Sequence, residues 1–578
     1  MIPDPLPTSR WRLGLLGVAA AAVALYLPTL FYGLVWDDNL LLRVMEDRLR
    51  AGGPASLLFS DFRLYPWEST GYYRPVVMLS LWLDRLLSGV LPFSFHLTNV
   101  LLHGLVSALV AAAGRRLTGS ATAALLGGLL FAVHPAHVES VAFVSGRTDL
   151  WAAAFGMASL LCWLRSREGA PSRLLPWPAW GGAAFLLACL SKEVAVLLPA
   201  VVLAWDAVVP AGGGDAPLPG WWRRNRGWAA AWGLSLAVLA ALRWGAAGLP
   251  PVPGVGASFA GSHVEEALGD WTLIPSMWVQ YLRLLALPWP LKIIYTPEQL
   301  NVTAFQVAGL LAFAGLAAAA SGTASRRVGL LALLWVGAFL LPVSGVVPLH
   351  GAIVAERFLY LPSAGFCLAA GGAAVLLGDR FRSARLATVA AGAAAALCAA
   401  GVLYASRPWR DDVALFTRVV QTTPRAWRGH DNLGNALTAQ GRLEEAMAHY
   451  LEAIRIKPDY AEAHFNLAVL LDQAGMSDAA IARYREAIRI APGFPEAHNN
   501  LGVLLERAGM ADEAIAHYRE ALRNRPGDAW AHKNMGNALT RRGRLEEAVF
   551  HYREALRSLP DDAEVRNNLE IALKATGR

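Results

Sequence analysis

The sequence LGLLGVAAAAVALYLPTLFYGL, residues Leu13–Leu34, is followed at once by Val35-Trp36-Asp37-Asp38. The first stretch carries no charged side chain and is long enough to cross the hydrocarbon core of a bilayer as a helix. Two adjacent carboxylates therefore follow the point where a hydrophobic helix leaves the membrane. Unpaired like charges are costly at such a place and usually mark a function. The alternative is a solvated helix end without a function.

The composition of the whole chain indicates a protein that crosses a membrane several times. Of its 578 residues 55% are apolar, and the mean hydropathy is +0.38. The net charge of +7 does not indicate nucleic-acid binding, because the arginines gather in short loops between apolar runs, where they set the topology. All four cysteines lie inside apolar runs, so we predict buried side chains and neither disulfides nor metal ligands.

The apolar runs predict about eleven membrane-spanning helices. They are residues 13–34, 94–113, 119–135, 149–164, 178–192, 193–209, 228–247, 304–321, 328–347, 357–377 and 386–405. The stretch Val76–Val90 has an amphipathic pattern, and we expect it at the membrane interface. The stretch Trp271–Pro290 is interrupted by prolines, and either it lies in the interface or it re-enters.

The arginine distribution predicts the orientation. If the N-terminus is cytoplasmic and Trp271–Pro290 does not cross, every arginine cluster falls on the cytoplasmic side and the C-terminus lies outside. Polar side chains that are costly at helix ends then gather on the outer side, where a single site near the membrane surface would collect them. They are Asp37, Asp38, Arg74, His134, His137, Glu139, Arg147, Asp149, Lys192, Glu193, His350, Glu356 and Arg357.

From Arg425 onward the chain is polar and periodic. Prolines recur at intervals of 34 residues, and between them a small residue, an alanine and a tyrosine keep fixed offsets, as Gly434, Ala446 and Tyr450 show. This pattern is typical of tetratricopeptide (TPR) repeats, which stack as pairs of helices. We therefore predict an all-α protein: a multispan domain at 1–405, a connecting half-repeat at 406–424 and a TPR solenoid at 425–578. The predicted parts of the solenoid are repeats 425–458, 459–492, 493–526 and 527–560 and a C-terminal capping helix.

One asparagine occupies the same offset in the first helix of every repeat. The five are Asn432, Asn466, Asn500, Asn534 and Asn568. A row of amides on the concave face can bond the backbone of an extended peptide whatever its sequence. Alternatively, these amides serve helix–helix bonds within the array. Histidines also repeat, at His430, His464, His498 and His532, and we interpret them as packing residues.

Several motifs of the chain resemble those of the transmembrane-and-TPR O-mannosyltransferases. The most specific are HPAHVESV at 134–141 and ERFLYLPS at 356–363; the others are Trp36-Asp37-Asp38, Tyr73-Arg74-Pro75, residues 96–103, residues 146–149 and Ser191-Lys192-Glu193. The resemblance implies a GT-C glycosyltransferase that moves a sugar, mannose in that family, from a polyprenyl-phosphate donor to Ser or Thr hydroxyls of a protein. The bias toward Ala, Arg and Gly and the short array point to a bacterial inner membrane.

The residues fit that chemistry in their own right. Asp37 is the predicted general base, and Asp38 a supporting acid. The leaving phosphate gains charge, which favours cations placed against it: Arg357 and Lys192 first, then Arg74 and Arg147. Glu139 and Glu193 pair with these cations or hold sugar hydroxyls, and His137 is a further candidate for donor binding. Because His134 and His137 with Asp38 make a weak ligand set, we predict no metal and no cofactor besides the donor.

Other functions remain open at this point. One is a membrane-anchored TPR scaffold for envelope proteins without catalytic activity, and another is a transporter of lipid-linked precursors, which would place charges in mid-membrane. A transferase with a lipid or glycan acceptor is a third. As partners we predict the lipid-linked donor and a protein or peptide acceptor in the TPR groove, and no nucleic acid; the sequence predicts no oligomeric state.

Overall fold

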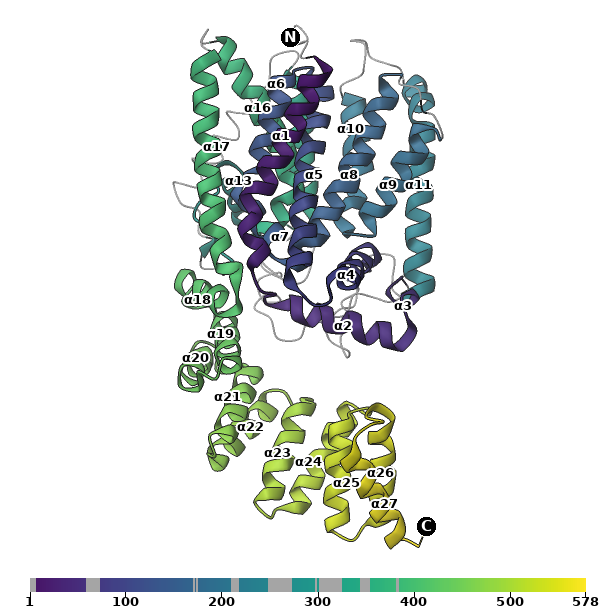
Figure 1. Cartoon of the computed structure of the whole chain (residues 1–578), viewed down its shortest axis with the longest axis vertical. Helices are drawn as coiled ribbons and strands as arrows, with labels where there is room; N and C mark the ends of the chain where they lie inside the picture. The colour runs from purple at the N-terminus through teal and green to yellow at the C-terminus, as the bar shows by residue number, and fades with distance from the viewer. Residues whose placement is uncertain are drawn as a thin grey trace. The chain divides into compact units, whose positions relative to one another are not determined.

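The computed structural model describes residues 7–58, 73–169, 172, 175–208, 218–247, 273–296, 299–300, 325–343, 354–380 and 384–577. These residues form helices joined by turns and loops, with no strand among them (Figure 1). The all-α prediction is thus confirmed. Two compact units can be separated, Met1–Arg418 and Val419–Arg578. The predicted boundaries at 405 and 424 stay predictions.

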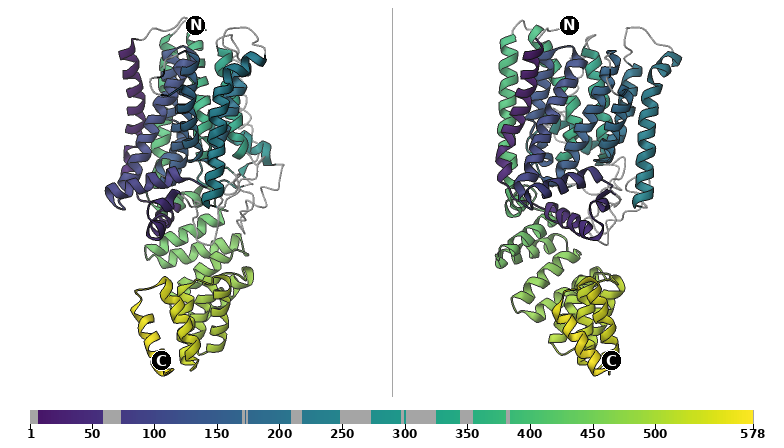
Figure 2. Two further views of the ribbon diagram at one scale, coloured as in Figure 1. Left: turned by 90° about the vertical axis from the view of Figure 1, so that its right-hand side faces the viewer. Right: turned by 45° about the vertical axis from the view of Figure 1, so that its right-hand side comes forward.

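The first unit is a bundle of apolar helices that run side by side (Figures 1 and 2). They are α1 Thr8–Tyr26, α5 Pro92–Thr118, α6 Ala121–Ala132, α8 Arg147–Arg167, α9 Trp177–Cys189, α10 Leu198–Val208, α11 Leu218–Ala247, α15 Ser325–Leu340, α16 Tyr360–Arg380 and α17 Ala384–Ser406. Helix α5 packs against α1, α6 and α8, and α16 packs against α6 and α15. Each predicted apolar run coincides with one of these helices, apart from 304–321, which lies outside the described residues.

Fewer helices than predicted are by themselves long and apolar enough to cross a membrane. Four described segments qualify, Thr8–Phe31, Pro92–Thr118, Glu356–Asp379 and Val389–Arg410, and the pair Ala121–Ala132 and Pro135–Ala142, bent by 52°, makes a possible fifth. Some of the other helices are too short: α9 has 13 residues, which span roughly 20 Å at 1.5 Å per residue. Helices α8 and α11 are long enough, with 21 and 30 residues, but do not meet the criterion for an apolar span. The number of about eleven crossings and the orientation therefore stay predictions.

Further helices lie across one end of the bundle. They are α2 Asp37–Gly52, α3 Ala55–Leu58 and α4 Pro75–Ser88, and Figure 1 shows them beneath the ends of the long helices. Their apolar faces share one buried cluster, which contains Leu41, Met45, Leu57, Val77 and Phe95. Helix α4 covers the stretch that we predicted to be an interfacial helix.

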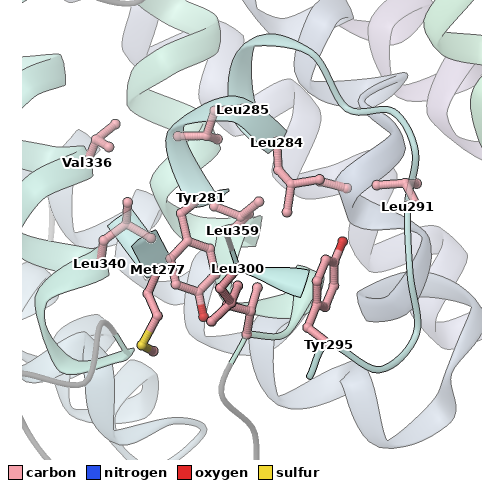
Figure 3. Close-up of a cluster of buried hydrophobic side chains, with 12 residues drawn as sticks. Met277, Tyr281, Leu284, Leu285, Leu291, Tyr295, Leu300, Val336, Leu340 and Leu359 are labelled. Carbon is pink, nitrogen blue, oxygen red and sulfur yellow. The ribbon is translucent and has the colours of Figure 1, made fainter. Parts of the chain in front are cut away.

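Helix α13, Ile274–Ala286, covers part of the stretch Trp271–Pro290. With 13 residues it is too short to cross a bilayer. Its side chains and those of the segment that follows pack against α15 and the start of the ERFLYLPS motif. Figure 3 shows this cluster, in which Tyr281, Leu284 and Tyr295 lie near Leu340 and Leu359.

The second unit consists of antiparallel helix pairs. The first helices are α19 Trp427–Ala439, α21 Ala461–Gln473, α23 Pro495–Arg507 and α25 Ala529–Arg541; the second are α20 Leu443–Ile456, α22 Ser477–Ile490, α24 Ala511–Asn524 and α26 Leu545–Ser558; α27 Ala563–Ala575 follows. The recurrent Gly and Tyr meet within each pair: a Cβ on Gly434 would lie 2.5 Å from the ring of Tyr450. The predicted TPR solenoid is confirmed.

Candidate functional site

The two adjacent aspartates begin helix α2, and the structure gives them different roles. Asp38 is buried, and its carboxylate accepts hydrogen bonds from the backbone N–H of Val144 (3.2 Å), from the N–H and hydroxyl of Ser145 (2.8 and 2.7 Å) and from Val35 N–H (3.4 Å). Burial raises the pKa of Asp38 to about 7, although these hydrogen bonds favour the charged form. Asp38 thus ties the start of α2 to η3, Val144–Gly146, and has little capacity left for a substrate.

Asp37 is half-buried and uncommitted. Among the described residues it makes no hydrogen bond and no ion pair, in contrast to Asp38. Burial raises its pKa, the positive charge of Arg357 opposes this, and the negative charge of Asp412 adds to it. A carboxylate with a raised proton affinity and no partner suits a general base.

Glu139 and Arg357 join the two most specific sequence motifs. Glu139 lies on α7, Val138–Ala142, and Arg357 on η8, Glu356–Leu359. The Glu139 carboxylate accepts hydrogen bonds from the Arg357 side chain and from its backbone N–H, both at 2.9 Å. Glu139 is buried, whereas the Arg357 side chain is 27% exposed. Arg357 therefore keeps unused N–H donors on an accessible edge.

Two further cations of the predicted site also have carboxylate partners. Lys192 pairs with Asp149 at 2.5 Å, and Arg74 pairs with Glu193 at 2.9 Å. Lys192 and Arg357 both lie over the ring of Phe358, at 5.2 and 5.5 Å from its centroid. The structure therefore gathers Arg357 and Lys192 around one aromatic ring, with Arg74 in electrostatic range of Lys192.

Sequence reasoning missed a fifth cation. Arg243, on α11, is buried within electrostatic range of Glu193 and Arg74. The signal was present, because Arg243 is a lone charge within the apolar run 228–247, and intramembrane charges usually have a function and a partner.

Two predicted donor-binding residues lie in the interior instead. Arg147 is fully buried, forms an ion pair with Asp84 (2.6 Å) and donates to Asn99 Oδ1 (2.9 Å) and the carbonyl oxygen of Phe95 (2.7 Å). His137 is also fully buried, and its Nε2 lies 2.7 Å from the Ser363 hydroxyl. Because neither side chain reaches an accessible surface, we withdraw both from the donor site and assign them to the packing of the bundle.

Metal ligation receives no support from the described residues. His134 Nε2 donates to the carbonyl oxygen of Leu285 at 3.0 Å, and the Asp38 carboxylate is taken up by backbone and hydroxyl donors. No group of three or more His, Cys, Asp or Glu side chains in this part of the chain is arranged to hold a metal ion. Metal independence stays a prediction, and His350 lies outside the described residues.

The asparagines of the repeats are half-buried, and four of the five use an amide N–H for a bond within the described array. Asn466 donates to Asp431 (2.9 Å) and Asn534 to Asn499 (2.9 Å), in each case on the first helix of the preceding repeat. Asn568 donates to Asn537 at 3.1 Å, and Asn500 lies 3.4 Å from the Tyr484 hydroxyl. Asn432 makes no side-chain bond within the described part of the array. The amide donors thus link repeats, while oxygens such as Asn466 Oδ1 keep their acceptor capacity.

The repeated histidines are buried, as predicted. Each bonds through Nε2 to the carbonyl oxygen of the proline six residues earlier, for instance His430 to Pro424 at 3.1 Å. Three of them also meet a second histidine through Nδ1. These pairs are His430 with His449, His498 with His517 and His532 with His551. Arg483 occupies the partner position in the second repeat.

The structure combines a unit that contains membrane-length apolar helices with a series of TPR repeats. In the first unit, a carboxylate and several cations lie near one another. Residues 69–219 match the family model of dolichyl-phosphate-mannose-protein mannosyltransferases. Residues 434–475, 473–509 and 494–561 match TPR models. The predicted resemblance is thus confirmed: the chain combines a mannosyltransferase-type region with TPR repeats.

Known relatives extend the similarity over most of the chain. Protein O-mannosyl-transferase Tmtc1 of Drosophila melanogaster is 30% identical over 531 residues, which cover 75% of this chain and 60% of that protein. Protein O-mannosyl-transferase TMTC3 of Mus musculus is 25% identical, over 76% of this chain and 51% of that protein. The chain therefore spans little more than half the length of these relatives.

Among solved structures, the TPR protein YrrB, described as having an unusual peptide-binding site, is similar to this chain at 20% identity. The similarity covers 28% of this chain and 84% of YrrB, with a TM-score of 0.26.

Proposed function

We propose that this protein is an integral-membrane glycosyltransferase that moves mannose from a polyprenyl-phosphate donor to Ser or Thr hydroxyls of a protein. The observation that supports it most is the uncommitted Asp37 carboxylate, which begins α2 at one end of an apolar bundle and lies in the field of Arg357. The similarity to named O-mannosyltransferases supports mannose transfer to a protein as the reaction class. We further propose a bacterial inner membrane, with a cytoplasmic N-terminus and the repeats outside.

In the proposed reaction the acceptor oxygen attacks the anomeric carbon of the sugar. Asp37 takes the proton of the hydroxyl as the new carbon–oxygen bond forms. The bond from the anomeric carbon to the phosphate oxygen breaks, and the polyprenyl phosphate leaves with one more negative charge. Arg357 and Lys192 stabilise this charge through N–H groups that their carboxylate partners leave unused, and Arg74 adds its positive charge nearby. The apolar helices would accommodate the polyprenyl chain, and no metal takes part.

A comparison of donors tests the reaction class. Reconstituted protein is given polyprenyl-phosphate mannose, polyprenyl-phosphate glucose or GDP-mannose together with a Ser/Thr-containing peptide and a chelator of divalent ions. We expect release of polyprenyl phosphate from the lipid-linked mannose and no use of GDP-mannose. Use of the nucleotide sugar alone would contradict the proposal, and transfer only to added lipid or glycan would assign a different acceptor class.

Replacing Arg357 with lysine is expected to weaken donor binding. Lysine keeps the charge but cannot hold Glu139 and a phosphate at the same time with separate parallel N–H groups. A hydrogen bond to a charged group contributes about 1.5–3 kcal/mol, so the Kd for polyprenyl-phosphate mannose should rise roughly 10- to 100-fold. The control is Arg85→Lys, since Arg85 forms a similar but more exposed pair with Glu46. An unchanged Kd in Arg357→Lys would move the phosphate site elsewhere.

The asparagine row is proposed to hold an extended acceptor segment, with the amide oxygens accepting from its backbone N–H groups. Changing Asn466, Asn500 and Asn534 together to alanine should raise the KM for a protein acceptor several-fold and spare a short peptide, since each neutral bond contributes about 0.5–1.5 kcal/mol. The array should also lose some stability, because Asn466 and Asn534 link repeats.

The variant Asn499→Ala separates the two effects, because it removes the partner of the Asn534 N–H and leaves the Asn534 oxygen in place. It should lower the unfolding temperature slightly and leave the acceptor KM unchanged. If the triple variant and Asn499→Ala raise the KM equally, the row is purely structural.

A further inference from the structure

Trp36, the residue before Asp37, has an unusual backbone conformation. Its φ is 54°, and no other non-glycine residue in the described part of the chain has a positive φ. Bulky L-residues rarely adopt this left-handed region, and they keep it only where the surroundings impose it. The direction in which α2 starts, and with it the position of Asp37, therefore depends on whatever holds Trp36.

Most of the contacts that hold Trp36 come from the segment after α17. The Trp36 N–H donates to Asp412 Oδ1 at 2.6 Å, and Asp412 is the first residue of α18, Asp412–Thr422. The Trp36 ring stacks on Phe143 at 5.8 Å and meets the edge of Phe416 at 5.9 Å. Two of these three contacts are thus made by the first half of α18, far along the sequence from Asp37.

The loop that precedes Trp36 is fixed by the same segment. The Gly33 N–H donates to the carbonyl oxygen of Arg410 at 2.9 Å. A Cβ on Gly33 would lie only 3.3 Å from that oxygen, so a side chain would push apart the segments that contain Gly33 and Arg410. On its other side, the Gly33 carbonyl accepts from His96 Nε2 at 3.2 Å.

We propose that Asp412 is a positioning residue for the base Asp37, which it serves through the Trp36 N–H and through its own negative charge. The inference rests on the proposed function, since it takes Asp37 as the base. It adds a residue that neither the motifs of the membrane unit nor those of the repeats contain. Because α18 runs on past the end of the first unit at Arg418, the base is held by the segment that leads into the repeats.

The charges around Asp37 set the direction of the electrostatic effect. Arg357 on η8 and Asp412 on α18 act on it with opposite signs, and Asp38 beside it is buried with donors of its own. The neighbouring Asp411 has other partners: its carboxylate pairs with Arg410 at 3.0 Å and accepts a hydrogen bond from the Ala414 N–H at 2.7 Å. Removing the charge of Asp412 should lower the pKa of Asp37. A base must be deprotonated to act, so the acidic limb of the pH–rate profile should then move to lower pH.

Two substitutions in the full-length protein separate the two effects. Asp412→Asn keeps an oxygen for the Trp36 N–H and removes the charge. We expect a plateau kcat within about threefold of wild type and an acidic limb of kcat/KM shifted down by about half a pH unit or more. Asp412→Ala removes the hydrogen bond as well, and kcat should fall at least about tenfold with an unchanged KM for the donor. Asp411→Asn, which loses the same charge and still caps α18, should match wild type in both readouts.

An acidic limb in Asp412→Asn that coincides with that of wild type overturns the electrostatic part, and a wild-type kcat in Asp412→Ala overturns the positioning part. If Asp412→Ala does not fold, the pH profile of Asp412→Asn still decides, because a purely structural role would not move it. Failure of the proposed function is distinguishable: the wild type itself would then transfer no sugar, whereas a wrong base assignment would leave Asp37→Asn active. An inactive Asp37→Asn beside a fully active Asp412→Ala overturns only the inference about Asp412.

Discussion

Asp37→Asn is expected to lower kcat for sugar transfer by about 10²- to 10⁴-fold, the usual contribution of a positioned general base. Donor affinity should stay within a few-fold of wild type, because the phosphate is assigned to Arg357 and Lys192. The amide has nearly the shape of the carboxylate but cannot take the proton of a hydroxyl. Single-turnover transfer and donor binding, measured on the same preparation, give both quantities.

The matched control is Asp47→Asn, which makes the same change at an exposed position of α2. It should leave transfer and folding unchanged. Burial raises the pKa of Asp37, so activity in the wild type should fall with decreasing pH at values above the ordinary range of an aspartate, as the carboxylate gains its proton. Wild-type kcat in Asp37→Asn would show that another group is the base.

Arg147→Met is expected to have the largest effect on stability. It removes the cation from a fully buried cluster and leaves Asp84 without its charged partner. Breaking a buried ion pair on one side costs about 3–5 kcal/mol, so most of the protein should fail to fold or should unfold at a much lower temperature in detergent. The double variant Arg147→Met/Asp84→Leu removes both charges, and we expect it to recover a good part of the lost stability.

The same experiment decides between two roles for Arg147. If Arg147→Met folds like wild type but binds the lipid-linked donor weakly, the residue contacts the phosphate, as its place in the motif at 146–149 first suggested. Loss of folded protein, with partial recovery in the double variant, assigns it to the interior.

Much of the fold could be predicted from local sequence patterns, because each pattern reflects packing between residues that are close in the sequence. The spacing of Gly434, Ala446 and Tyr450 recurs because a tyrosine ring of one helix fills the space above a glycine of the other. The histidine pairs also reflect a repeated spacing: His430 and His449 are 19 residues apart, and the same spacing separates the paired histidines of two other repeats. An alignment of the repeats could have revealed these pairs.

The candidate site was only partly predictable, because a charge at a helix end looks the same in sequence whatever it meets in space. Arg357 and Arg147 both lie at the start of an apolar run and within a strong motif. One keeps an exposed edge beside Glu139, and the other is enclosed by Asp84 and Asn99, which are brought in by other helices. The partner of Trp36 could not be predicted for the same reason: Asp412 reaches it only through the tertiary fold.

Identification of the reaction product tests the proposed function most directly. Purified full-length protein is incubated with polyprenyl-phosphate mannose and a protein acceptor, and the acceptor is analysed by mass spectrometry with site localisation. We expect one hexose on Ser or Thr residues with the wild type and none above background with Asp37→Asn. An unmodified acceptor in the presence of bound, intact donor, or equal modification by Asp37→Asn, would contradict the proposed function and its base.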